Sequence, residues 1–315
     1  MVEIIVVNWN AGRRLTDTII SIKNHHSFLV DSVTIVDNAS TDNSLALLHS
    51  LVGDLPFPFR IIRNEENRGF AAACNQGAAS ARSKYLLFLN PDTRLFENSL
   101  LVPWLFMERP ENNNVGICGI QLIDETGHVS RTCSRFPSVK RYAAEAFGLS
   151  RVRHLRSWGH RMAEWNHGVD RAVDQLIGAF FFVRTNFFRM LNGFDERYFV
   201  YFEEVDFSYR ANQAGYQSIF LANAQAFHAG GGSSQHVKAL RLFYNLRSRL
   251  QYGFKHFWHS RVAVLLVITI IIEPVSRLIF SFLRRNPKDL RYTIVAYLML
   301  WRTLPAIIKQ GLHLE

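Results

Sequence analysis

Residues 85–93, YLLFLNPDT, decide the fold that this sequence predicts. Tyr85–Leu89 is a continuous apolar run, which is typical of a short strand covered on both faces, as in a parallel sheet. The run stops at Asn90-Pro91-Asp92-Thr93, where polar side chains follow directly on the last apolar residue. The stretch therefore predicts a buried strand that carries Asn90 and Asp92 at its carboxyl end.

The same pattern occurs three times earlier in the chain. Each apolar run ends in a polar residue: Glu3–Val7 before Asn8, Val33–Val36 before Asp37, and Phe59–Ile62 before Asn64. Helical patterns separate the runs, over residues 13–23, 45–51 and 70–81. This alternation predicts an α/β fold with a mostly parallel central sheet and right-handed crossovers.

The polar strand ends predict where a ligand binds. In open α/β sheets, ligands occupy the crevice outside the carboxyl ends of the strands. Asn and Asp are also common turn residues, but four such ends in succession favour a polar ligand crevice. The sequence contains neither the GxGxxG fingerprint nor a P-loop, so a dinucleotide or P-loop site does not explain the crevice.

A cluster of carboxylates lies in the stretch Gly178–Gly215. An apolar strand, a short helical piece and an aromatic approach lead to Glu203, Glu204 and Asp206, at the start of an expected helix over 203–213. Apolar walls and neighbouring like charges both disfavour ionisation, so we expect at least one carboxyl to have a raised pKa, as a general base requires. The alternative is that these acids only complement the dipole of the helix.

The sequence also predicts a metal-binding site. His228 precedes the run Gly230–Gly232 and follows the carboxylate cluster in a chain that also offers Asp92. An Asp and a His, with positions left open for phosphate oxygens and water, suit Mg²⁺ or Mn²⁺. The glycines would let the loop close over a bound phosphate. The alternative is that His228 is an ordinary linker residue.

The charge of the chain divides it into two regions. Of its 36 Lys and Arg and 26 Asp and Glu, 13 and 3 fall within residues 235–315, which leaves 23 of each in residues 1–234. We therefore predict a catalytic domain over residues 1–235, with halves at about 1–115 and 116–235, and a basic helical region over 236–315. Three cysteines without a CxxC pair suit a reducing compartment, and no signal peptide is expected.

The basic C-terminal region predicts contact with a membrane surface. Its apolar runs, Val262–Ile272 and Tyr292–Trp301, are short for a spanning helix and are flanked by Lys and Arg. Apolar helices with basic flanks describe an anchor that lies on an anionic membrane, here the inner face of the cell membrane. The alternative is a helical cap packed on the catalytic domain or on a second copy in a homodimer. No nucleic-acid partner is expected, because residues 262–283 are mostly aliphatic.

Taken together, the motifs VVNWN, VDNASTD, NRGFAAACNQG, LFLNPDT, GFDERYFVYFEEVDFSYR and HAGGGSS resemble the inverting glycosyltransferases of family 2, which have the GT-A fold. The resemblance covers residues 1 to about 255. Within the family, the chain is most similar to bacterial rhamnosyltransferases of surface-polysaccharide synthesis. The fold class implied is GT-A, with a membrane-associated helical appendage at the C-terminus.

The resemblance implies a role for each matching residue. Asp37 would bind the nucleobase, and the nucleotide-sugar pocket would be lined from the same motifs by Asn8, Asn10, Asn67, Gly69, Asn75 and Asn90. Asp92 would ligate the metal that bridges the diphosphate, and His228 matches the late metal-binding His. Glu204 stands where the family usually has an Asp as catalytic base, so Glu203 and Asp206 stay open as alternatives.

The activity implied is metal-dependent transfer of a sugar from a dTDP- or UDP-linked donor to a saccharide or lipid-linked saccharide. One base and in-line displacement predict inversion at the anomeric carbon. A carboxylate deprotonates the acceptor hydroxyl, and the metal stabilises the departing diphosphate. The competing hypothesis is a module that binds a nucleotide sugar or saccharide without turnover.

Overall fold

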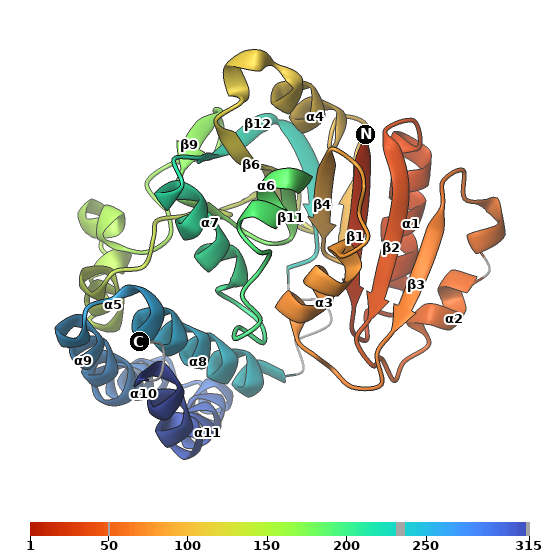
Figure 1. Ribbon diagram of the computed structural model, residues 1–315. Helices are drawn as coiled ribbons and strands as arrows, with labels where there is room; N and C mark the ends of the chain where they lie inside the picture. The colour runs from red at the N-terminus through yellow and green to blue at the C-terminus, as the bar shows by residue number, and fades with distance from the viewer. Residues whose placement is uncertain (50, 231–236, 313–315) are drawn as a thin grey trace. The chain divides into compact units, whose positions relative to one another are not determined.

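The strand β1 (Val2–Asn8) lies at the centre of a parallel group in the computed structural model, which describes residues 1–49, 51–230 and 237–312. It pairs in parallel with β2 (Val30–Asp37) on one side and with β4 (Tyr85–Leu89) on the other. β2 pairs in parallel with β3 (Phe59–Arg63). Figure 1 shows these four strands side by side with their arrowheads at the same edge. The βαβαβαβ prediction is confirmed, and every residue of β4 is buried, as an unbroken apolar run requires.

The rest of the sheet is mixed. Ten strands of the described chain form one sheet in the order β3-β2-β1-β4-β11-β6-β12-β5, with β7 paired to β6 and β9 to β12. β11 runs antiparallel to β4 and β6, and β12 runs parallel to β6. The remaining strands are β5 (Thr93–Leu95), β6 (Val115–Ile123), β7 (Val129–Ser130), β8 (Cys133–Ser134), β9 (Arg171–Val173), β10 (Gln175–Leu176), β11 (Phe180–Arg184) and β12 (Gln217–His228).

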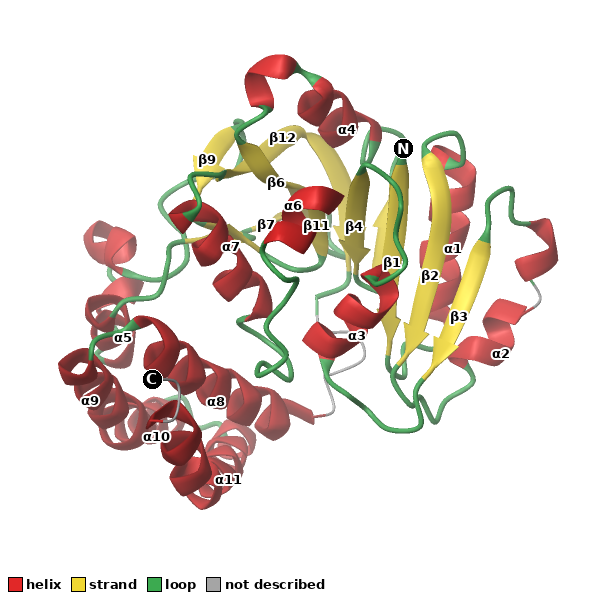
Figure 2. Cartoon of the chain, viewed as in Figure 1, coloured by secondary structure: helices red, strands yellow, loops and turns green. Residues whose placement is uncertain are grey.

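Helices cover both faces of the parallel part of the sheet (Figure 2). α1 buries Leu15, Ile19 and Ile22 in the core cluster that contains Ile4 of β1. α3 packs on the opposite face, where a Cβ at Gly77 would lie 2.5 Å from Ile5 Cγ2, so only glycine allows this close approach. The helices of this part are α1 (Arg13–His26), α2 (Ser44–His49), α3 (Phe70–Ala78), α4 (Leu101–Glu108), α6 (Thr185–Met190) and α7 (Glu203–Gln213), with 3₁₀ turns η1 (Val52–Asp54) and η2 (Pro110–Asn112).

The described chain divides into two compact units. Unit 1 comprises Met1–Ser134, Trp165–Glu196 and Glu203–Ser233, and unit 2 comprises Arg135–Glu164, Arg197–Phe202 and Ser234–Glu315. The composition of the chain predicts one boundary near residue 235. The structure additionally groups two internal segments, Arg135–Glu164 and Arg197–Phe202, with the C-terminal helices.

Unit 2 is helical. Its helices are α5 (Val139–Ala146), α8 (Lys238–His256), α9 (His259–Val267), α10 (Glu273–Leu283) and α11 (Pro287–Leu312), with 3₁₀ turns η3 (Leu149–Arg151) and η4 (Arg153–Trp158) and a π-helical segment η6 (Ile268–Ile272). α9, η6 and α10 form one continuous helix, His259–Leu283. Glu273-Pro274, which interrupts the apolar run in the sequence, therefore does not end the helix. Glu273 forms a buried ion pair with Arg249 and a second pair with the partly exposed Arg277.

The strand β12 is longer than the apolar run in its sequence predicts. The sequence predicts a strand over residues 218–221, and the structure extends it to His228 through an irregularity between Leu221 and Gln225. The extension pairs with β5, where His228 is opposite Thr93. His228 is therefore the last residue of a strand and not part of a linker. Of the glycine run that follows, Gly230 is described, with a φ of +66°, and residues 231–236 lie outside the described residues.

Candidate active site

The carboxyl ends of β1 and β2 bring Asn8 and Asp37 together. The two residues are register partners at the last position of their strands, and both are buried. Asn8 Nδ2 donates a hydrogen bond of 2.7 Å to Asp37 Oδ1. The backbone N–H of Ser40 donates to the other carboxylate oxygen at 3.3 Å. The Asp37 carboxylate is thus held in one orientation at the edge of the sheet.

Asn8 and Asn10 hold the loop that follows Asp37. Asn8 Nδ2 also donates to Ser44 Oγ at 2.8 Å, and Asn10 Oδ1 accepts from the backbone N–H of Thr41 at 2.8 Å. Both side-chain amides therefore have protein partners in this structure. The sequence identifies these asparagines as pocket residues, and their contacts assign them the task of shaping the wall around Asp37.

Asn38 is a residue of this edge that the sequence reasoning missed. Its side chain is buried, donates to Asn67 Oδ1 at 2.8 Å and to the backbone oxygen of Gly69 at 3.0 Å, and accepts from the backbone N–H of Arg68 at 3.0 Å. Asn38 thereby ties the loop after β2 to the loop after β3. The signal was present in the sequence, since Asn38 directly follows Asp37 at the end of the strand.

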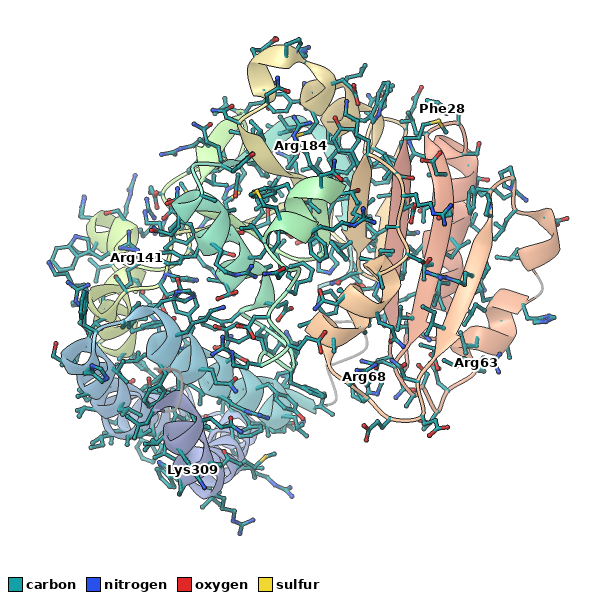
Figure 3. The ribbon with its side chains drawn as sticks, viewed as in Figure 1. Phe28, Arg63, Arg68, Arg141, Arg184 and Lys309 are labelled. Carbon is teal, nitrogen blue, oxygen red and sulfur yellow. The ribbon has the colours of Figure 1, made fainter. Side chains whose placement is uncertain are left out.

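Gly69 and its neighbours complete this edge. Gly69 has a φ of +87°, which side-chain-bearing residues rarely adopt, and its N–H donates to Asn67 Oδ1 at 3.0 Å. Arg63 and Arg68 are exposed, and Figure 3 shows both at the end of the molecule where β1–β3 finish, away from Phe28 at the opposite end. These two cations lie where an anionic ligand of the crevice would be attracted.

Asn75 has a different environment from the other predicted pocket residues. Its amide donates to the backbone oxygen of Phe194 at 2.8 Å and to Glu196 Oε1 at 3.0 Å, and it accepts from the N–H of Phe194 at 2.9 Å. Asn75 therefore fixes the loop after α6, at Phe194 and Glu196, which precedes the carboxylates of α7 in the chain. Its role in the nucleotide-sugar pocket stays a prediction.

Asp92 and His228 lie side by side, as the metal prediction requires. His228 Nε2 is 3.4 Å from Asp92 Oδ1 and 3.3 Å from Asn90 Nδ2. The pairing of β12 with β5 brings the two residues together. One carboxylate and one imidazole are a donor set that fits Mg²⁺ or Mn²⁺, with the other positions left to phosphate and water. Within residues 1–49, 51–230 and 237–312, no group of three or more His, Cys, Asp or Glu could hold a metal.

The three carboxylates at the start of α7 have three different environments. Glu203 is 4% exposed, Glu204 is half-buried and Asp206 is 0% exposed. Helical spacing predicts this pattern, because residues 203 and 206 share a face and residue 204 is offset. The three acids therefore cannot have the same function.

Glu203 is held in the neutral form. Burial, followed by the charge of the neighbouring Glu204, raises the pKa of Glu203 well above its usual value. Among the described residues, Glu203 Oε2 has no hydrogen-bond partner, so no donor favours its ionised form at this oxygen. A proton on Glu203 removes one negative charge from beside Glu204.

Asp206 has a structural partner. Its Oδ2 accepts from Arg210 Nε at 2.7 Å, one turn along α7. Arg210 also donates to the backbone oxygen of Gly193 at 2.8 Å. The Asp206–Arg210 pair therefore fixes the loop after α6 to the first turns of α7.

A family model and several known proteins match this chain. The model of glycosyl transferase family 2 matches residues 3–168, more than half of the chain. The chain therefore belongs to glycosyl transferase family 2.

Among curated relatives, the chain is 27% identical over 209 residues to the N-acetylglucosaminyl-diphospho-decaprenol L-rhamnosyltransferase of Mycobacterium tuberculosis (strain ATCC 25618 / H37Rv), covering 62% of this chain and 66% of that protein. It is 24% identical over 173 residues to the rhamnosyltransferase WbbL of Escherichia coli (strain K12), covering 55% of this chain and 62% of that one. The matches thus span slightly less than two thirds of the relatives' length.

Solved structures share the fold. The mannosyltransferase PcManGT from Pyrobaculum calidifontis, in complex with GDP-Man and Mn²⁺, superposes with a TM-score of 0.59 at 13% identity, covering 95% of this chain and 86% of that one. Residues 1–349 of TarS from S. aureus, in complex with UDP-GlcNAc, superpose with a TM-score of 0.54 at 15% identity, covering 98% and 92%. The chain has the GT-A glycosyltransferase fold, as its motifs predict.

The raised pKa of Glu203 predicts a pH-dependent stability. A proton retained by a buried carboxyl stabilises the fold below its unfolded pKa near 4.5, and this contribution is lost as the pH rises toward the folded pKa. Glu203→Gln mimics the neutral form and removes the dependence. From pH 5 to pH 8, the wild type should lose stability relative to Glu203→Gln by at most about 1.4 kcal/mol per pH unit.

Thermal or urea unfolding across this pH range measures the difference. Glu125→Gln, in an exposed turn, is the matched control and should track the wild type at every pH. Curves of the wild type and Glu203→Gln that stay parallel from pH 5 to pH 8 would contradict a neutral Glu203.

Proposed function

We propose that this protein is a metal-dependent inverting glycosyltransferase of surface-polysaccharide synthesis, which transfers rhamnose from a dTDP- or UDP-linked donor to a saccharide or lipid-linked saccharide. The observation that carries the proposal is that unit 1 contains all the residues the reaction would need. These are Asp37 at the end of β2, the Asp92–His228 pair, and a half-buried Glu204 next to Glu203, whose pKa is raised. Rhamnose is favoured because two relatives are named rhamnosyltransferases.

The donor has a binding surface at the carboxyl ends of the strands. Asp37 offers a fixed carboxylate to the N–H groups of a nucleobase. Asp92 and His228 would hold Mg²⁺ or Mn²⁺ against the diphosphate, where the cation acts as a Lewis acid toward the leaving group. Asn90 Nδ2 lies 3.3 Å from the same His228 nitrogen, Nε2, that faces Asp92, so Asn90 borders the proposed metal position.

The reaction needs a base on the acceptor side. Glu204 takes the proton of the acceptor hydroxyl while that oxygen forms a bond to the anomeric carbon. The bond from the anomeric carbon to the diphosphate oxygen breaks with its electron pair on the diphosphate. Attack opposite the leaving group inverts the configuration at the anomeric carbon.

Glu204 is favoured over its neighbours by its surroundings. Burial and the charge of Glu204 raise the pKa of Glu203, which favours its protonated form, and Asp206 is fully buried in its pair with Arg210. Glu204 is the one of the three that is half-buried rather than buried, and because its Oε2 atom is enclosed, an acceptor hydroxyl would have to reach the other carboxylate oxygen. Its extra methylene, compared with the Asp usual in the family, extends the carboxylate further from the helix.

We expect Glu204→Gln to lower the rate of transfer by at least about 10²-fold, because the amide cannot take the acceptor proton. Donor affinity should stay unchanged, since donor contacts come from the strand ends. The measurement is transfer to a lipid-linked acceptor, with donor binding followed by titration. Asp206→Asn is the control: it should lower thermal stability, because it leaves the Arg210 guanidinium without its carboxylate. An active Glu204→Gln with an inactive but folded Asp206→Asn would move the base to Asp206.

We expect a nucleotide sugar to stabilise the protein against heat more strongly when Mn²⁺ is present, because ligand binding to the native state raises the melting temperature. Asp92→Ala and His228→Ala should each remove the metal-dependent part of this stabilisation. Asp54→Ala, an exposed acid of unit 1, is the control. Screening dTDP-, UDP- and GDP-sugars in the same assay identifies the donor. Full turnover in excess EDTA would refute the metal role.

Unit 2 supports a peripheral position on an anionic membrane. One stripe of exposed apolar residues follows helix His259–Leu283 at intervals of three and four residues: Val264, Val267, Ile271, Val275, Ile279 and Phe282. The buried Glu273 lies on the opposite side of this helix. The helix is the one candidate span in the described chain by length and composition, and a third of its apolar window is buried.

Basic residues flank this apolar stripe. Exposed Lys and Arg lie before, between and after the apolar segments, at Arg261, Arg284, Arg285, Lys288, Arg291, Arg302 and Lys309. The last of these is labelled in Figure 3. The neighbouring helix α11 adds exposed Leu298 and Trp301. Apolar surface with basic flanks suits an anionic lipid surface, and a lipid-linked acceptor would present its sugar there.

We expect the protein to sediment with vesicles of phosphatidylglycerol and phosphatidylcholine, and less with phosphatidylcholine alone or at high salt, because exposed charges are screened. Phe282→Ser should weaken binding, since this side chain is 77% exposed on the stripe. Phe28→Ser, at an exposed position of unit 1, is the matched control. If Phe282→Ser instead converts a dimer to a monomer and neither protein binds vesicles, the stripe covers a second copy.

A further inference from the structure

The segment Arg197–Phe202, which we call the approach segment, ends one peptide bond before Glu203. It belongs to unit 2, where it packs along α8. Phe199 stacks on Tyr244 with ring centroids 4.8 Å apart, and Arg241 Nε donates to the Tyr201 hydroxyl at 3.2 Å. Each of these contacts joins one residue of the approach segment to one residue of α8.

Two further contacts continue the series. Ser248 Oγ donates to the backbone oxygen of Val200 at 3.0 Å, and the rings of Phe202 and Tyr252 lie 5.7 Å apart. The four α8 residues are Arg241, Tyr244, Ser248 and Tyr252, at intervals of three, four and four. At 3.6 residues per turn, they fall within about 80° around the helix axis. One face of α8 therefore follows the approach segment over its last four residues.

The backbone of the approach segment explains why it needs this support. Tyr201 and Phe202 have φ values of +68° and +73°. Bulky residues avoid this left-handed region, and two in succession persist only where surrounding contacts impose them. The two residues set the direction in which the chain enters α7, and so they set where Glu203 and Glu204 begin.

We infer that the face of α8 formed by Arg241, Tyr244 and Ser248 positions the catalytic base of the transfer reaction by holding the approach segment in its left-handed conformation. The inference rests on the proposed function, in which Glu204 is the base. It makes these three residues and Tyr201 positioning residues, since they act through the peptide link to Glu203.

If the α8 residues position only the base, their loss should affect kcat and donor affinity differently. Donor contacts lie on the strand ends of unit 1, and none of the α8 residues belongs to them. Loss of an α8 contact should therefore lower kcat and leave the affinity for the nucleotide sugar unchanged. A small displacement of a reacting group is enough to reduce the rate by one to two orders of magnitude.

The experiment compares paired substitutions in the full-length protein. Tyr244→Phe keeps the ring that stacks on Phe199, and Tyr244→Ala removes it. We expect Tyr244→Ala to lower kcat about tenfold, and Tyr244→Phe to restore the wild-type value. Arg247→Ala, on the same helix but outside this face, is the control. The affinity for nucleotide sugar, from thermal shift, should be the same in all four proteins.

A second pair remains informative if Tyr244→Ala does not fold. Tyr201→Phe removes only the hydroxyl that accepts from Arg241, and Arg241→Met removes the donor. Each should lower kcat, and the double variant should be no slower than the slower single one, because both break the same bond. Variants with wild-type kcat, or a loss of donor affinity equal to the loss of kcat, would overturn the inference.

These outcomes differ from a failure of the proposed function. If the wild type transfers no sugar from any donor that binds it, the glycosyltransferase proposal fails. If the wild type is active and Glu204→Gln is inactive, but Tyr201→Phe, Arg241→Met and Tyr244→Ala all behave as the wild type, only the positioning role fails.

Discussion

Parallel pairing of β1 with both β2 and β4 is the constraint on which the site depends. The register between β1 and β2 places Asn8 opposite Asp37, and a slip of one residue would turn Asn8 toward the other face of the sheet. β4 ends three residues before Asp92, so the same pairing brings the metal candidate to the edge that carries Asp37. β12 and β5 then add His228 beside Asp92. Residues far apart in the chain meet because short strands finish at one edge.

Much of this arrangement could be predicted from the sequence. The apolar runs predicted β1 to β4 and their direction, and a polar residue at each strand end predicted the crevice. The acidic helix α7 begins and ends where its pattern predicts. The strands and the helix are confirmed because they rest on local features, namely an unbroken apolar run, a polar stop and a helical period, whereas the ligand crevice at the strand ends stays a prediction. Asp92 and His228 were proposed as metal ligands from their donor chemistry and from the family resemblance, since their contact depends on an antiparallel strand pair that no local pattern indicates.

The sequence could not separate the roles of the three carboxylates. In the sequence, Glu203, Glu204 and Asp206 are three neighbouring carboxylates of similar chemistry. They differ in their surroundings in the folded protein. Burial and the neighbouring charge of Glu204 keep a proton on Glu203, while Arg210 holds Asp206. The contacts of Asn75 with the backbone of Phe194 were likewise not visible in its motif. Assigning such roles requires knowing which groups approach from elsewhere in the fold.

Unit 2 is assembled from three stretches of chain, and this has a consequence for the order of folding. As the ribosome releases the chain from its N-terminus, the parallel strands of unit 1 become available early. The approach segment emerges before its partners on α8, which follow after roughly 40 further residues, or several seconds of synthesis at ordinary rates. Tyr201 and Phe202 have no α8 contacts to impose their left-handed backbone during that interval. The four parallel strands are therefore complete in the nascent chain before the α8 contacts of the approach segment can form, so the backbone leading into α7 is fixed late in synthesis.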